Sequence, residues 1–163
     1  MPARWAHELQ CRRVKPHPSR LQPGNYAHQV DIPCRFADVD PLWHLNNVRI
    51  VELYQEGRIA FNQALASEYD LLRETDHRLV VARQTVDYLG EVKWPGRVLI
   101  GVGASRVGTS SFTLALAMFQ HDHCVGISDT VMVYASSLGP QPLPQRMREL
   151  LHRSMFKDPA ALA

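Results

Sequence analysis

At 163 residues, with 45% hydrophobic and 21% charged residues, the chain is long enough for one domain with a substantial buried core. A formal net charge of +2 offers no general attraction for nucleic acid, and no apolar run approaches the length that spans a membrane, so we expect neither as a partner. The cysteines are odd in number, widely spaced and not preceded by a signal-peptide hydrophobic segment, which predicts a reduced, cytoplasmic protein without structural disulfides: Cys11, Cys34 and Cys124.

Residues 1–28 differ in composition from the rest of the chain. They contain five basic residues, one acidic residue and four prolines. Such a segment breaks helices and has little to bury, so we expect a loosely ordered basic extension. The prolines also spoil the amphipathic helix of an organelle-targeting signal, and two packed helices of a helix-turn-helix reader do not fit in this length.

Tyr26–Ala37 has the pattern of a first strand, and Pro33 indicates an edge position or a bulge within it. Phe36–Leu65 then contains the only long helical pattern in the sequence. Apolar residues recur there at steps of three and four, which predicts one helix with one apolar stripe: Ile50, Leu53, Tyr54, Gly57, Phe61, Ala64 and Leu65. Because glycine is a poor helix former, we expect Gly57 to mark the close approach of a strand or of a partner helix.

The turn before this helix is rich in side chains that can do chemistry. Asn46 or Asn47 is a natural N-cap, so the turn delivers its polar groups to the positive end of the helix dipole. These groups are Asp38, Asp40 and His44. Pro41 keeps Asp40 out of the helical conformation, and a developing oxyanion could be held beside the free helix amides. From residue chemistry alone, ordinary turn aspartates and a solvated or capping histidine explain the pattern equally well.

After a short polar connection at Ala66–Asp76, alternation with a period of two predicts four more strands. They fall at Arg78–Leu89, Val98–Ala104, Phe112–Met118 and Val125–Val133. In the first of them one face is expected to carry Val80, Ala82, Gln84, Val86 and Tyr88. In the next strand Gly101 and Gly103 leave one surface almost bare, as happens where a ligand, a helix or another backbone approaches, or where packing is simply close.

Turns at Pro95-Gly96, Gly108-Thr109-Ser110 and His121-Asp122-His123 separate these strands. The last turn and Cys124 offer four ligand-type side chains in a row. Adjacent residues on a tight turn splay apart, and no second group with zinc-site spacing exists elsewhere in the sequence, so we expect a polar hairpin tip and no metal. The tail, with three alternating prolines from Pro140, has the pattern of a linker followed by a short helix over Gln145–Met155.

These elements predict an α+β fold in which an antiparallel five-stranded sheet curls around one long helix. The expected organisation is an extension over residues 1–28, a domain over 29–138 and a tail with a short helix over 139–163. A single curved sheet over one helix leaves an open edge and an exposed face, so we expect self-association at least to a dimer.

The element order and the turn resemble the 4-hydroxybenzoyl-CoA thioesterase-like branch of the hotdog-fold acyl-CoA thioesterases, over about Val30 to Ser136. In that family an aromatic residue and an aspartate precede Gly-His-Val-Asn-Asn, and the helix carries an aromatic-Glu-Glu-Ala-Arg segment. This chain reads Phe36-Ala37-Asp38-Val39-Asp40-Pro41-Leu42-Trp43-His44-Leu45-Asn46-Asn47, then Tyr54-Gln55-Glu56-Gly57-Arg58. Trp43 stands at the family's glycine. If that glycine serves a positive backbone angle, the loop here must take another course, because a bulky residue adopts such an angle reluctantly.

The resemblance implies hydrolysis of an acyl-CoA thioester without a cofactor, in a homodimer or homotetramer whose active sites lie at the dimer interface. Asp40 falls on the family's catalytic aspartate, beside His44, and the amide near Asn47 falls where the family polarises the thioester carbonyl. The candidates for substrate binding are Trp43, Tyr54, Arg106, Ser110 and Ser111. The first two could wall an acyl pocket or pack as core. The last three resemble a hairpin with a glycine and paired serines seen in many family members, and a solvated arginine on a polar hairpin explains them as well.

Two other functions stay open at this point. Hotdog hydratases of enoyl or hydroxyacyl thioesters use an aspartate and a histidine around Asn-Pro, and Asp38-Val39-Asp40-Pro41-Leu42-Trp43-His44 looks superficially similar. Its spacing is one residue too long, and Asp40 replaces the asparagine. A catalytically silent acyl-CoA-binding module is the other alternative, because a carboxylate at this place is equally compatible with binding an acyl-CoA and with hydrolysing it. The acyl group, and coenzyme A against acyl carrier protein, are not fixed by any sequence feature.

Overall fold

The computed structural model describes residues 15–68 and 76–157. The expectations for residues 1–14, Cys11 among them, and for most of the connection before Asp76 lie outside these ranges. The strands are β1 (His28–Pro33), β2 (Arg78–Tyr88), β3 (Arg97–Val107), β4 (Ser111–Gln120), β5 (His123–Ser136) and β6 (Gly139–Pro140). The helices are α1 (Asn47–Glu68), α2 (Gln145–Arg153) and the 3-10 turns η2 (Pro18–Leu21), η3 (Pro23–Asn25) and η4 (Phe36–Asp38).

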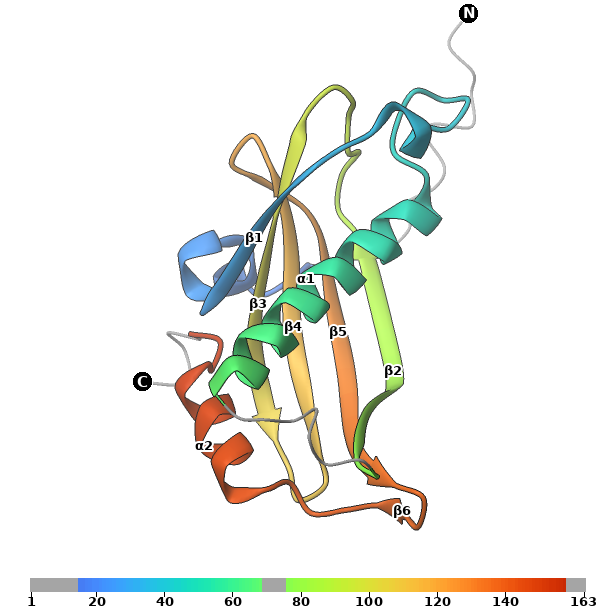
Figure 1. Cartoon of the computed structure of the whole chain (residues 1–163). Helices are drawn as coiled ribbons and strands as arrows, with labels where there is room; N and C mark the ends of the chain where they lie inside the picture. Colours follow the sequence, from blue (N-terminus) through green and yellow to red (C-terminus); the bar gives the residue numbers. More distant parts are fainter. Residues whose placement is uncertain (1–14, 69–75, 158–163) are drawn as a thin grey trace, which may run out of the picture.

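The antiparallel sheet has the order β1-β3-β4-β5-β2, with β6 paired to β5, and it curls around α1 (Figure 1). The expected α+β class and five-stranded sheet around one long helix are therefore confirmed. β1 is shorter than the expected strand, because the chain turns into η4 after Pro33. β1 and β2 form the two edges of the sheet, so the long crossover through α1 joins one edge to the other.

The apolar stripe of α1 packs on the concave face of the sheet. Ile50, Leu53, Tyr54, Phe61 and Leu65 are all buried, each contributing about 1.5–3 kcal/mol by leaving water. Ala64 is exposed, contrary to the expectation, because the helix rotates this position away from the sheet.

The outer strand β2 departs from the expected alternation. A register shift between Val81 and Arg83 leaves Ala82 unpaired, so side chains before it change face relative to those after it. Val80 pairs with Val133 on the convex side, whereas Gln84 pairs with the buried Thr130 on the helix side. The expectation that Val80 shares a face with Gln84 is therefore wrong, and Val80 is 42% exposed at the open edge of the sheet.

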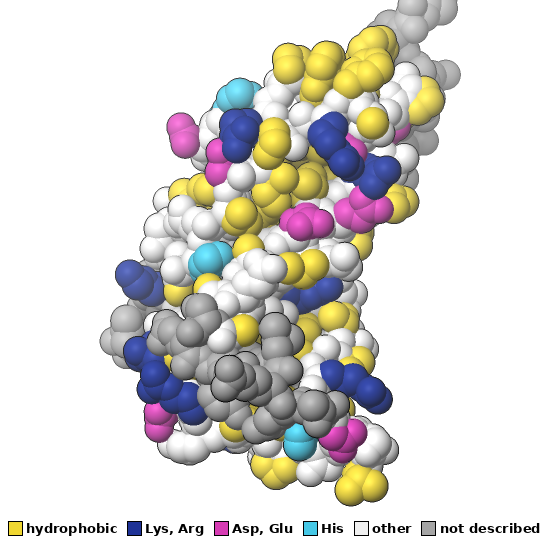
Figure 2. Space-filling view, viewed as in Figure 1, with side chains coloured by type: hydrophobic (Ala, Val, Ile, Leu, Met, Phe, Trp, Pro, Cys, Tyr) yellow, Lys and Arg dark blue, Asp and Glu magenta, His cyan; other side chains and the backbone are white. Residues whose placement is uncertain are grey.

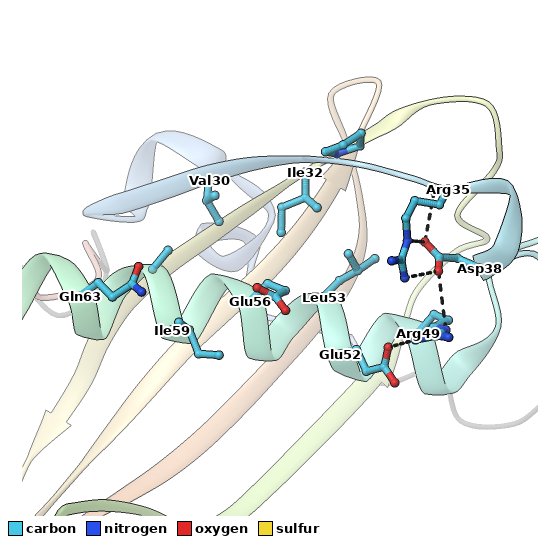
Figure 3. A pocket seen from close by; sticks show the side chains of 12 residues that line it. Val30, Ile32, Arg35, Asp38, Arg49, Glu52, Leu53, Glu56, Ile59 and Gln63 are labelled. Carbon is cyan, nitrogen blue, oxygen red and sulfur yellow. Dashed lines mark hydrogen bonds and ion pairs between the residues drawn. The ribbon is translucent and has the colours of Figure 1, made fainter.

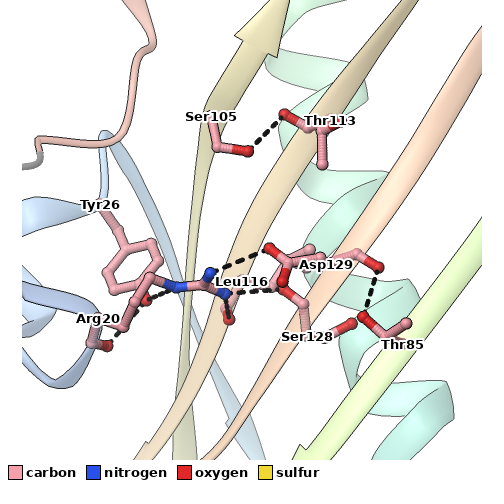
Figure 4. A network of polar contacts seen from close by, with 8 residues as sticks. All are labelled: Arg20, Tyr26, Thr85, Ser105, Thr113, Leu116, Ser128 and Asp129. Carbon is pink, nitrogen blue, oxygen red and sulfur yellow. Dashed lines mark hydrogen bonds and ion pairs between the residues drawn. The ribbon is translucent and has the colours of Figure 1, made fainter. Parts of the chain in front are cut away.

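Residues 15–27 are packed against the convex face of the sheet, and in this part the expectation of a loosely ordered extension is wrong. The Arg20 guanidinium donates to Asp129 Oδ1 at 3.0 Å and to two strand carbonyls at 3.1 Å each (Figure 4). The Tyr26 hydroxyl donates to the Arg20 carbonyl at 2.8 Å, and burial raises the pKa of Tyr26 to about 12. Sequence composition missed this because one well-placed arginine is enough to hold a short segment on a sheet.

The bare surface at Gly101 and Gly103 is filled by the protein itself. A Cβ at Gly101 would lie 2.6 Å from the Tyr26 ring, and one at Gly103 would lie 3.0 Å from the Phe156 backbone. Of the open alternatives, close packing is the one observed.

No helix within residues 15–68 and 76–157 is long and apolar enough to cross a membrane.

His121 and Asp122 both have positive φ, at 49° and 63°, and form the tight turn between β4 and β5. The described residues contain no group of three or more histidine, cysteine, aspartate or glutamate side chains placed to hold a metal ion.

Candidate functional site

The turn before α1 is a small hairpin fastened to the strand connection beside it. Val39 and Leu45 pair as an antiparallel bridge, and Asp40 N–H donates to the His44 carbonyl at 2.9 Å. Leu45 N–H donates to the Val92 carbonyl at 2.9 Å, which ties the hairpin to the segment that leads into β3. The backbone at the head of α1 is thereby held in one arrangement without help from the side chains at the hairpin tip.

Trp43 adopts a positive backbone angle, which glycine accepts far more readily than a bulky residue. Its N–H donates to the Asp40 carbonyl at 3.0 Å, closing a tight turn, and its φ is 65°. A tight turn followed by a left-handed residue is a common three-residue hairpin loop. The expectation that the loop must take another course is therefore wrong: Trp43 accepts the strain, and the side chain is left 70% exposed.

This strain leads to a stability prediction. Because the Trp43 side chain is mostly exposed, replacing it removes little packing, and the backbone angle decides the outcome. Left-handed conformation costs a residue with a Cβ about 1 kcal/mol or more, and glycine escapes that cost. We expect Trp43→Gly to have a free energy of unfolding about 1 kcal/mol above that of Trp43→Ala, measured in urea. The opposite order would mean that the turn relaxes away from its positive backbone angle.

The Asp40 carboxylate lies at the tip of this hairpin with its side chain 22% exposed. One oxygen, Oδ1, accepts the Leu42 N–H at 2.8 Å and lies 3.8 Å from His44 Nδ1. The other ring nitrogen, His44 Nε2, lies 3.5 Å from Glu91 Oε1. The second oxygen of Asp40 has no hydrogen-bond partner among the described residues, so one face of this carboxylate remains open for chemistry.

Asn46 is the N-cap of α1, one of the two positions expected. Its side-chain oxygen accepts the Val48 N–H at 2.9 Å, and its carbonyl accepts the Ile50 N–H at 3.1 Å. Asn47 is the first helical residue, and its N–H has no acceptor within residues 15–68 and 76–157. A free amide at the positive end of a 22-residue helix is suited to hold negative charge on oxygen.

Asp38 differs sharply from Asp40, although the two are close neighbours in the chain. It is 3% exposed, and its oxygens accept from the Arg35 side chain at 2.7 and 3.1 Å. Arg49 Nε lies 3.6 Å from the same carboxylate (Figure 3). The hydrogen bonds from Arg35 hold the pKa of Asp38 below its usual value. Asp38 is buried and fixes the start of the hairpin through its bonds to Arg35. This structural role does not fit the catalytic aspartate that a hydratase alignment would place at Asp38.

Beside this ion pair a groove of about 410 Å³ runs between β1 and α1. Its floor is apolar, and charged side chains of both signs line one end, where Arg49 and Glu52 form an ion pair (Figure 3). Arg35 and Arg49 were not singled out in the sequence. The spacing Arg35 to Asp38 was the available signal, because three residues bring both side chains to one side of a helical turn.

The hairpin also displays apolar side chains to solvent. Those with the largest exposed fractions at this end of the molecule are Phe36, Leu42, Trp43 and Val48. Figure 2 shows hydrophobic side chains gathered over the start of α1. An apolar rim around a carboxylate and a free amide suits a substrate with an apolar part near its reacting carbonyl.

The remaining substrate-binding candidates lie elsewhere in the chain. Tyr54, a residue of α1, is fully buried between the helix and the sheet, where its hydroxyl would lie 2.7 Å from a Cβ at Gly126. Arg106, Ser110 and Ser111 lie at the hairpin between β3 and β4, and from Arg97 to Arg106 the strand extends roughly 30 Å. A single chain therefore does not bring this hairpin together with Asp40.

A different arginine contacts that hairpin. Arg148 of α2 donates to the Gly108 carbonyl at 2.8 Å and to the Thr109 carbonyl at 3.3 Å. No pattern in the sequence indicated this contact, because α2 and the hairpin are far apart in the chain.

The chain is similar in sequence and in fold to several known proteins. Residues 34–151 match the thioesterase-like superfamily. The uncharacterized protein YsmA of Bacillus subtilis (strain 168) is 34% identical over 84 residues, which are 51% of this chain and 54% of YsmA, so the match spans about half of that relative. The PA5185 protein of Pseudomonas aeruginosa strain PAO1 has a TM-score of 0.72 at 26% identity, covering 83% of this chain and 96% of that one. A thioesterase of Thermus thermophilus, complexed with coenzyme A and Zn, has a TM-score of 0.71 at 28% identity, covering 82% of this chain and 98% of that one.

Proposed function

Because the chain belongs to the thioesterase-like superfamily, we propose that it hydrolyses an acyl-CoA thioester to the free acid and coenzyme A. The observation that carries the proposal is the pairing of an open carboxylate, Asp40, with the free amide of Asn47 at the head of α1. Coenzyme A as the thiol is supported by the Thermus thermophilus thioesterase, which holds that coenzyme and resembles this chain over 82% of its length.

Each group has a definite task in the proposed reaction. As general base, Asp40 takes a proton from water while the water oxygen attacks the thioester carbonyl. As nucleophile, Asp40 attacks that carbonyl itself, and water then hydrolyses the resulting anhydride. In both routes Asn47 N–H donates to the carbonyl oxygen as it becomes an oxyanion, and the carbon–sulfur bond breaks to release a thiolate. The thiolate becomes the free thiol by taking a proton, from protonated Asp40 in the first route and from water in the second. His44, whose Nδ1 lies 3.8 Å from Asp40 Oδ1, helps to position the carboxylate.

The proposal includes a second copy of the chain. The edge strand β2 pairs with β5 alone among the described strands and carries two exposed valines, Val80 at 42% and Val81 at 40%, which is typical of an edge covered in an assembly. A second copy also explains how one coenzyme could contact both Arg106 and Asp40, which lie far apart within one chain. A coenzyme that reaches Arg106, Ser110 and Ser111 while its thioester lies at Asp40 must span two copies.

The proposed activity is tested by release of free thiol from a panel of short, long and aromatic acyl-CoAs. We expect turnover of at least one class, with the free acid as the product by mass spectrometry. Addition of water to an enoyl-CoA without thiol release would instead identify a hydratase. Tight binding of acyl-CoA with neither reaction would identify a binding module.

Arg106 gives a prediction about the coenzyme. The phosphates of coenzyme A need cations or free amides, and Arg106 is exposed beside a turn with two serines. We expect Arg106→Ala to raise the KM for acyl-CoA, more so at low salt, while turnover of a truncated acyl-pantetheine substrate stays unchanged. An equal effect on both substrates, or none on either, would place the phosphates elsewhere on the assembly.

A further inference from the structure

A row of polar side chains is buried between α1 and the strands β2 and β5. Thr130 is fully buried and Ser128 is 1% exposed, and both hydroxyls lack a hydrogen-bond partner in the described residues. The amide nitrogen of Gln84, which pairs with Thr130 across the strands, and the side-chain oxygen of Asn62 also lack partners there. A polar group buried without a partner costs about 1–3 kcal/mol, so a row of them needs a reason other than stability.

Arg58 stands in the middle of this row. It is 8% exposed, and its guanidinium makes one long hydrogen bond within the described residues, from Nη1 to Gln84 Oε1 at 3.5 Å. No aspartate or glutamate of the described residues lies within ion-pair distance of it, and burial lowers its pKa. A buried guanidinium without an anion is costly, since desolvation is not offset by a partner charge.

The row begins farther along the helix that carries the proposed oxyanion donor, the Asn47 N–H, at its first residue. Asn47, Tyr54, Arg58 and Asn62 are spaced by seven, four and four residues, which keeps them on one helix face. From Asn47 to Arg58 the helix rises about 16 Å, a distance that an extended acyl chain can cover. Beyond Arg58, Asn62 borders a mostly apolar hollow of about 300 Å³ between α1 and the start of β2, with Arg78 at its rim.

We propose that Arg58, Gln84, Ser128 and Thr130 bind the far end of the acyl group, and that this end carries a carboxylate. The inference rests on the proposed thioester hydrolysis and names its substrate class, the thioesters of dicarboxylic acids. The guanidinium, the Gln84 amide and the two hydroxyls can all donate, whereas Asn62 offers a lone acceptor. These four side chains form a positive, donor-rich site that matches the charge and the acceptor lone pairs of a carboxylate. A methyl end would give these donors no acceptor.

The test uses the whole protein and pairs of acyl-CoAs matched in chain length, one ending in a carboxylate and the other in a methyl group, over a series of lengths. We expect the unaltered protein to favour the carboxylate member of a pair by about tenfold or more in kcat/KM, as a charge-assisted contact predicts. Arg58→Met keeps the volume and removes the charge, and should lower that preference by about tenfold, so that the two members of a pair are used almost equally. Arg146→Met, an exposed arginine of α2, is the matched control and should leave the preference unchanged.

Stability gives a second readout that a structural arginine would not produce. If Arg58 is kept for a ligand, Arg58→Met should melt at a higher temperature than the unaltered protein without substrate, because an unpaired buried charge has been removed. Thr130→Val removes one donor at constant volume, and should lower the preference severalfold even if Arg58→Met fails to fold.

Three outcomes would overturn the inference. The first is equal use of both members of every pair. The second is an unchanged preference in Arg58→Met or Thr130→Val. The third is loss of assembly by Arg58→Met with the preference intact, which would assign Arg58 to a carboxylate of a second copy. If no acyl-CoA is hydrolysed at all, the affinities of the two members of each acyl-CoA pair are compared by calorimetry. Failure of the proposed hydrolysis is thereby distinguished from failure of the proposed carboxylate-binding site.

Discussion

An Asp40→Asn variant is expected to fold and melt like the unaltered protein and to lose about a hundredfold or more in kcat for thiol release. The fold should survive because an asparagine oxygen can still accept the Leu42 N–H, which Asp40 Oδ1 accepts at 2.8 Å. The backbone bonds of the hairpin, including Asp40 N–H to the His44 carbonyl, do not involve the side chain. Activity should fall because a neutral amide neither takes a proton from water nor attacks a thioester. Stopped assays of free thiol, with melting curves on the same samples, measure both effects.

Asp76→Asn is the matched control for this variant. It makes the same chemical change in an exposed carboxylate next to β2, where Asp76 accepts the Ser137 hydroxyl at 3.1 Å. We expect its kcat to be within a factor of about two of the unaltered value, as is usual for a remote surface substitution. If folded Asp40→Asn releases thiol at a near-normal rate, Asp40 has no part in the chemistry, and the free Asn47 amide alone would not support the proposed mechanism.

The local architecture could be read from the sequence because it depends on neighbours in the chain. Alternation with a period of two indicated the strands, and steps of three and four indicated the helix, since these periods follow directly from backbone geometry. Asn46 was recognisable as an N-cap candidate because capping needs only a short polar side chain next to the first helical residues. Pro41 located Asp40 outside the helix for a similarly local reason.

Features that depend on distant contacts could not be predicted in this way. Asp38 and Asp40 look alike in the sequence, and only the fold brings Arg49 up to one of them. The unpaired residue at Ala82 reverses the face of Val80, and no residue type signals such a shift. Arg106 resembled a coenzyme contact by its local pattern, but the length of β3 separates it from Asp40 within one chain. Arg58 looked like one more polar helix residue in the sequence, and only the structure shows that it is buried with no acid of residues 15–68 and 76–157 within ion-pair distance.

The largest stability effect is expected at Gly57, in the middle of α1. A Cβ at this position would lie 2.4 Å from Ile100 Cγ2 and 3.1 Å from Ile100 Cβ, so the close approach expected from the sequence is made by β3. A leucine here must push the helix away from the sheet, and we expect Gly57→Leu to lose about 3 kcal/mol or more of unfolding free energy, or to fail to fold.

Gln55→Leu, an exposed change on the same helix, serves as the control for helix propensity and should change the unfolding free energy by less than about 0.5 kcal/mol. The contact itself is isolated by a double-mutant cycle. Ile100→Ala removes the clashing Cγ2, so the cost of Gly57→Ala should shrink when both changes are combined, with a coupling of about 1 kcal/mol or more. Costs that simply add would show that the helix already clears Ile100. A stable Gly57→Leu protein with only its acyl preference altered would instead show that this position faces the acyl group, not the sheet.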